Sequence, residues 1–170
     1  MESGAIAQGD ARATTVKVNV ESMFPAARAS LWKTFEQHFA PGTDISTIHP
    51  NIRSQKVVEG HGELPGFSMN KEMTIDRVLK VGRKTWQTRW KVDFSPPDKL
   101  RWEIVSGHGP VDAGTWIENS YAEVGGATRI ASKGEIVLPG VPKFLAGLLV
   151  RRLMNQWDAQ DLRTLKSRNL

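Results

Sequence analysis

The chain has no cysteine among its 170 residues, and this absence narrows the chemistry open to it. Disulfide bonds, thiolate nucleophiles and cysteine-ligated zinc or iron–sulfur sites are all excluded. A chain without disulfides is typical of an intracellular protein, because disulfides form and persist mainly in oxidising compartments. We therefore expect a cytoplasmic protein.

Long hydrophobic runs are also missing. No stretch of the sequence reaches the roughly 20 apolar residues that a transmembrane helix needs. The first 14 residues have neither the basic start nor the apolar core of a secretory signal peptide. We expect a soluble protein in which residues 1–13 form a flexible leader and residues 14–170 form a single domain.

Catalytic and metal-binding motifs are scarce. The histidines are His38, His49, His61 and His108, and their spacing gives no metal-binding motif. No serine lies in a nucleophile elbow, and no glycine-rich loop precedes a helix as a phosphate site requires. The sequence predicts no metal and no cofactor, and it argues against kinase, hydrolase and dinucleotide-binding functions.

Positive charge is in excess, at +5, but it is not gathered in one block. Lys and Arg are scattered from Arg12 to Arg168, so nucleic-acid binding is not expected. The densest basic group lies near the C-terminus and suits transient contact with lipid head groups. Its members are Arg151, Arg152, Arg163, Lys166 and Arg168. The sequence leaves a monomer and a homodimer equally open.

Alternation of apolar and polar residues predicts a first strand from Thr14. Apolar residues at helical spacing follow Pro25 and stop at Pro41, which predicts a first helix. Residues 43–49 suit a short second helix, and residues 52–59 a second strand. Turn-forming Gly and Pro clusters then divide the chain into hairpins, so consecutive strands are expected to pair antiparallel. These later strands are predicted at residues 66–80, 84–94, 99–106, 112–124 and 128–138.

The last element is a helix predicted from Lys143 to about Ser167. Its first half, residues 144–150, is apolar nearly all round, and such a helix requires burial on every side. A curled sheet would supply that burial. The order of elements therefore predicts an α+β helix-grip fold: a curved antiparallel sheet of six to seven strands around the long C-terminal helix, with two short helices between strands one and two.

Four local motifs carry a family resemblance. They are the glycine-rich turn at residues 60–66, Gly114-Thr115-Trp116, the hairpin at residues 125–129, and Leu138-Pro139-Gly140 before the last helix. In this order they resemble the SRPBCC superfamily, the START and pollen-allergen-like helix-grip group that includes polyketide cyclases and aromatases. The resemblance implies a cavity between sheet and helix for lipids, sterols, quinones, plant hormones or polyketide intermediates. It carries over no catalytic residue.

Large side chains recur with period two on the predicted strands, where they suit the wall of an apolar cavity. Trp86 and Trp90 share one strand face, and Trp102 shares a face with Leu100 and Ile104. For the strand at residues 112–124 we favour the Trp116 face as the inward one. Plain core packing is the alternative for all of them. The predicted ligand contacts are Trp86, Trp90, Trp102, Trp116, Met69, Met73, Leu145, Leu149 and Leu153.

Two residues are candidates for acid–base chemistry, Glu118 and His108. Glu118 shares the favoured face with Trp116, where burial would raise its pKa or require a cationic partner such as Lys71 or Arg77. His108 lies between glycines in a loop that, like residues 60–66, suits a gate at the cavity mouth, and imidazole titrates near neutrality. The alternative is that the side chains of Glu118 and His108 are both exposed to solvent, and the sequence leaves this open.

Three functions follow from this pattern. The first is binding or transport of a hydrophobic small molecule. The second is a cyclase or aromatase-type enzyme, which would need Glu118, His108, Arg89 or Lys71 to face the cavity. The third is a membrane-associated adaptor or lipid-delivery protein, in which residues 144–150 and the adjacent basic pair contact a membrane. Whether the protein is an enzyme stays open, and binding alone is favoured.

Overall fold

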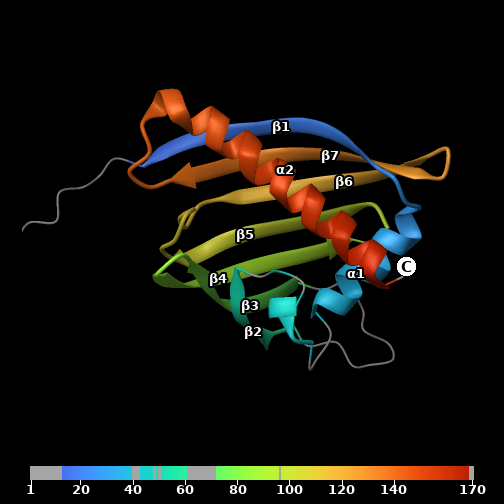
Figure 1. The fold of residues 1–170 in the computed structure, drawn as a ribbon, viewed down its shortest axis with the longest axis horizontal. Coiled ribbons are helices and arrows are strands. Elements are labelled where there is room, and N and C mark those ends of the chain that lie inside the picture. The colour runs from blue at the N-terminus through green and yellow to red at the C-terminus, as the bar shows by residue number, and fades with distance from the viewer. Residues whose placement is uncertain are drawn as a thin grey trace, which may run out of the picture.

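Seven antiparallel strands form one sheet in the computed structural model, which describes residues 13–39, 43–47, 49, 51–60, 72–95 and 97–168 (Figure 1). The strands lie in the order β1-β7-β6-β5-β4-β3-β2, so β2 to β7 form a meander and β1 adds to its far edge. The elements are β1 (Thr14–Phe24), α1 (Arg28–Phe39), the 3-10 turn η1 (Ile45–Thr47), β2 (Ile52–Glu59), β3 (Glu72–Val81), β4 (Lys84–Ser95), β5 (Lys99–Gly107), β6 (Trp116–Val124), β7 (Ala127–Leu138) and α2 (Lys143–Arg168).

The predicted fold is confirmed in its order of elements and its antiparallel pairing, and two details differ among the described residues. The expected second short helix is a single 3-10 turn, η1. The strand predicted at residues 66–80 is β3, and its predicted part before residue 72 lies outside the described residues. The strand predicted from Asp112 begins at Trp116, because Gly114 has φ 88° and breaks the extended backbone before it.

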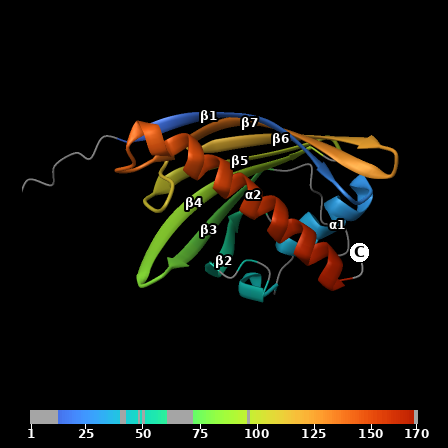
Figure 2. The same ribbon diagram turned by 45° about the horizontal axis from the view of Figure 1, so that its top comes forward.

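The sheet is curved, and α2 lies on its inner side (Figure 2). In Figure 1, α2 runs diagonally across the strands from the β1–β7 side towards α1. The core fills the space between them, because one side chain in two along each strand points to this concave face. The most deeply buried side chains of that layer are Leu31, Met73, Ile75, Ile104, Ile117 and Ile136.

The expected burial of the first half of α2 on every side is wrong. Ala146, Val150 and Met154, spaced four residues apart, are buried against the sheet. On the opposite side, Phe144 is 83% exposed and Leu148 is 68% exposed. The physical reason is geometric: the sheet curls beneath α2 without closing over it, so one face of the helix stays outside. Among the described helices, none is both long and apolar enough to cross a membrane.

Candidate ligand-binding cavity

A cavity of about 350 Å³ lies between the concave face of the sheet and the second half of α2. This volume is at the lower end of the range for pockets that hold small molecules. Strands β3 to β7, both helices and the segment before β2 contribute to its wall. The lining includes Phe35, Phe39, Val92, Leu100, Ile117, Tyr121, Ile130, Leu153 and Met154.

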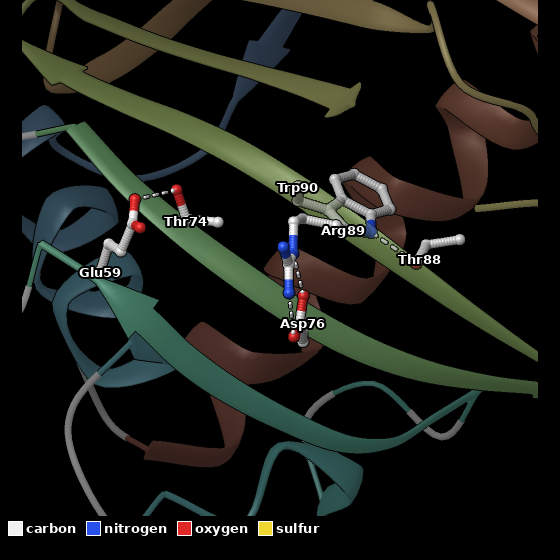
Figure 3. Close-up of polar contacts among 6 residues, drawn as sticks. All are labelled: Glu59, Thr74, Asp76, Thr88, Arg89 and Trp90. Atoms are coloured by element: carbon white, nitrogen blue, oxygen red, sulfur yellow. Dashed lines mark hydrogen bonds and ion pairs between the residues drawn. The ribbon is translucent and has the colours of Figure 1, made fainter. Parts of the chain in front are cut away.

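Three tryptophans form the aromatic side of the cavity. The ring centroids of Trp90 on β4 and Trp102 on β5 lie 4.9 Å apart, and those of Trp102 and Trp157 on α2 lie 5.2 Å apart at 81°. The Nε1 of Trp90 donates a hydrogen bond to Oγ1 of Thr88 at 2.7 Å, which fixes the indole (Figure 3). Edge-to-face and tilted rings of this kind give a rigid apolar surface.

The structure brings some predicted ligand contacts together and separates others. Trp90, Trp102 and Leu153 line the cavity. Trp86 is half-buried on the same face of β4 as Trp90 but does not line the cavity, and Met73 is buried in the core opposite Val92 of β4. The remaining predicted contacts that do not line it are Trp116, Leu145 and Leu149, while Met69 lies outside the described residues.

The prediction that the Trp116 face of β6 looks inward is wrong. Ile117, Asn119 and Tyr121 line the cavity instead. Directly opposed residues of an antiparallel pair lie on the same face of the sheet. Because Ile117 is opposite Trp102, it shares the inner face with that tryptophan, and Trp116 is forced outward. On the outer face the Trp116 ring lies 4.3 Å from the guanidinium carbon of Arg101.

The two catalytic candidates lie away from the cavity. The carboxylate of Glu118 is on the outer face, 2.8 Å from Nζ of Lys133, and the hydrogen bond from this lysine lowers the pKa of Glu118. His108 is 89% exposed, and its Nδ1 lies 3.5 Å from Asp112. Neither expected acid–base role has geometric support, because neither side chain reaches the cavity.

Of the basic residues named with them, the structure describes Arg89 and Arg77. Arg89 pairs with Asp76 at 2.7 Å on the face of β4 opposite to Trp90, as Figure 3 shows. Lys71 lies outside the described residues. Arg77 lines the cavity, although Glu118, its suggested partner, does not.

Sequence reasoning missed a polar end of the cavity that combines α1, the segment before β2 and α2. His49 Nδ1 lies 3.1 Å from Oε1 of Gln160, within hydrogen-bond distance. The rings of His38 and His49 lie 5.0 Å apart. Burial, then the charge of Arg77, lowers the pKa of His49 to about 4, against the opposing effect of Gln160. His49 is therefore neutral at physiological pH and serves as a fixed hydrogen-bonding group.

A carboxyl group lies in the same wall. Asp158 on α2 lines the cavity, and burial raises its pKa, while a hydrogen bond with Ser22 opposes this effect. Asn119 on β6 also lines the cavity, and its Oδ1 has no hydrogen-bond partner among the described residues. Within that same part of the chain, no three His, Asp or Glu side chains gather as metal ligands.

Protein-family models and curated protein sequences give no match to this chain. Solved structures do, at low identity. Ara h 8.0201 is 16% identical, with a TM-score of 0.65 over 90% of this chain and 99% of that chain. The di-domain ARO/CYC StfQ from the steffimycin biosynthetic pathway is 12% identical, with a TM-score of 0.66 over 90% of this chain. The chain spans 50% of that protein.

A third similar structure extends over nearly the whole chain. Norcoclaurine synthase from Thalictrum flavum, in complex with dopamine and hydroxybenzaldehyde, has a TM-score of 0.58 at 12% identity, covering 98% of this chain and 95% of that chain. Identities this low establish shared architecture and not shared activity. The chain therefore has the fold of these proteins, and the predicted helix-grip fold is confirmed.

Proposed function

We propose that the protein binds and carries an apolar small molecule in the cavity between the sheet and α2. The observation that supports this most is the aromatic wall of Trp90, Trp102 and Trp157 beside about 350 Å³ of space. A cavity that combines a large aromatic wall with a smaller number of polar side chains suits a ligand that buries most of its surface and is oriented by a polar group. The similar structure of norcoclaurine synthase holds two small aromatic ligands, dopamine and hydroxybenzaldehyde, which is consistent with this role.

A cyclase or aromatase-type reaction is the second candidate. Two similar solved structures are di-domain aromatase/cyclases, and the half-buried Asp158 has a raised pKa, as a general acid requires. The neutral His49 is a weak base because its pKa is about 4. With Glu118 and His108 outside the cavity, one carboxyl group would have to move every proton. Binding without chemistry therefore has the stronger support.

Addition of a long-chain alcohol such as decanol is expected to shift the tryptophan emission, since three of the six tryptophans line the cavity. At a free ligand concentration about 100 times the Kd, binding adds about 2.7 kcal/mol to the free energy of unfolding. Differential scanning fluorimetry would register this as a melting temperature raised by roughly 5–10 °C. Fluorescence titration measures the affinity directly.

The outcome of this experiment separates the two candidates. Mass spectrometry of the recovered ligand, repeated with a quinone and a linear polyketone, gives an unchanged molecule if the protein is a carrier and a converted one if it is a cyclase. If no alcohol, acid, quinone or polyketone changes the emission or the melting temperature, the binding function is wrong.

Delivery of the ligand at a membrane is supported by a separate observation. Four apolar side chains of α2, Phe144, Leu145, Leu148 and Leu149, are exposed. We call them the α2 apolar face. Lys143, Arg151 and Arg152 flank this face and are also exposed, and no acidic residue lies between Lys143 and Trp157. An exposed apolar helical face with basic flanks is typical of a surface that binds anionic lipid.

Vesicle flotation tests the α2 apolar face. Wild-type protein is expected to float with phosphatidylserine-containing vesicles and to remain below pure phosphatidylcholine vesicles. The double variant Phe144→Ser/Leu148→Ser should bind about tenfold less, because it removes apolar area from the inserted face. Val124→Ser, at an exposed apolar residue of the β6 end, is the matched control and should bind like wild type. Equal flotation of all three proteins would refute membrane docking through α2.

A further inference from the structure

Arg77 on β3 is a cation in the wall of the cavity. It lies on the inner face of the sheet, opposite the buried Thr88 of β4. Its guanidinium carbon is 4.7 Å from the centroid of the Trp90 ring and 5.9 Å from that of Phe39. The guanidinium therefore lies within cation–π distance of two aromatic rings, which favour a cation through their negative faces.

A second contact fixes the orientation of the guanidinium. Nε of Arg77 donates a hydrogen bond to Oε1 of Gln55 on β2 at 2.8 Å. Gln55 is held in turn, because its Nε2 donates to the backbone carbonyl of His38 at 2.9 Å. The two terminal nitrogens of Arg77, Nη1 and Nη2, donate no hydrogen bond to a described residue. They therefore form a fork of the guanidinium that is available to a ligand.

No carboxylate compensates this charge within the described residues. Five other Lys and Arg side chains of the same part of the chain form ion pairs with Asp or Glu, and Arg77 is in none of them. The carboxyl group that shares the cavity is Asp158, and no nearby cation lowers its pKa. Buried charges are normally paired, because an uncompensated charge in a low-dielectric site is costly.

Arg77 keeps its charge despite this environment. Burial lowers its pKa to about 10, which is still far above neutral pH. The neighbouring His49 is neutral, and the positive charge of Arg77 contributes to that. Among the described lining residues of the cavity, Arg77 is thus the one cation, and Asp158 is the one carboxyl group.

From this arrangement we infer that the ligand is an amphiphile with one carboxylate, which pairs with the terminal nitrogens of Arg77 while its apolar body packs against Trp90, Trp102 and Trp157. A guanidinium fork matches the two oxygens of a carboxylate. One cation suits one negative charge, whereas a phosphate dianion would call for a second. This inference rests on the proposed binding function and specifies the ligand class for the same cavity.

Matched ligands that differ only in their head group test the inference. Decanoate and decanol share a ten-carbon chain, so the apolar contacts are equal and the charge is the variable. At pH 7.5, isothermal titration calorimetry is expected to give wild-type protein an affinity for decanoate at least about tenfold above that for decanol. In Arg77→Gln this preference for decanoate over decanol should vanish.

The control variant is Arg89→Gln, which removes one positive charge from the adjacent strand, on the outer face of the sheet. It should keep the wild-type preference for decanoate, which separates the local contact from the net charge of the protein. Arg77→Lys keeps the charge without the fork and should retain an intermediate preference. If Arg77→Gln does not fold, Arg77→Lys and the wild-type comparison of acid with alcohol decide the question.

The possible failures are distinguishable. If wild type binds decanol and decanoate equally, or if Arg77→Gln keeps the preference, the carboxylate inference is wrong and the apolar-carrier function stands. If neither ligand binds, and the quinone and polyketone also fail to bind, the carrier function itself is wrong and the inference falls with it.

Discussion

The variant Gly107→Ala is expected to lose about 4 kcal/mol of its free energy of unfolding, whereas Gly126→Ala should lose only about 1–2 kcal/mol. Both glycines have positive φ, 98° and 80°, a conformation that is unfavourable for alanine. At Gly107 an added Cβ would also lie 2.2 Å from the backbone oxygen of Gln87 and 2.9 Å from Cα of Thr88. At Gly126 nothing lies within 4 Å.

The contrast between these two variants isolates the close approach of β4 and β5. Since Gly107 is opposite Thr88, a clash there requires the end of β5 to move away from its partner strand. Urea denaturation followed by circular dichroism measures both stabilities. Equal losses of stability in the two variants would mean that a Cβ at residue 107 does not clash with the backbone oxygen of Gln87.

The second large effect is expected from filling the cavity. Leu153→Trp should reduce the affinity for decanol and decanoate by about a hundredfold, because Leu153 lines the cavity and the indole takes space that the ligand needs. Isothermal titration calorimetry is the suitable measurement, since an added tryptophan would complicate emission spectra. The melting temperature without ligand should change little, as the new side chain has empty space to enter.

Leu149→Trp is the control for this prediction. Leu149 lies one turn earlier on α2, is 37% exposed and does not line the cavity. The two variants carry the same substitution on the same helix, so they differ mainly in whether the indole reaches the ligand. Wild-type affinity in Leu153→Trp would place the ligand somewhere other than this cavity.

For Arg77, the sequence predicts the face of the strand but not the groups that surround the side chain. Period two places Arg77 on the face of Met73 and Ile75, and the structure confirms that this face is the inner one. The sequence around Arg77 does not predict that no carboxylate among the described residues pairs with it. Such pairing depends on where Asp158, more than 80 residues away in the sequence, comes to lie. The same is true of His49 and Gln160, which meet only because α2 crosses the sheet near η1.

The sequence by itself determined the order of strands and helices, the hairpin pairing and the helix-grip fold, because these follow from short-range periodicity and from the backbone preferences of Gly and Pro. Only the tertiary structure decided which face of β6 lines the cavity and which side of α2 stays exposed. The sequence is compatible with either Trp116 or Ile117 on the inner face of β6. Because Ile117 is paired with Trp102, which lines the cavity, Ile117 lies on that face. The burial of a side chain depends on which surfaces meet, and residues distant in the sequence supply those surfaces.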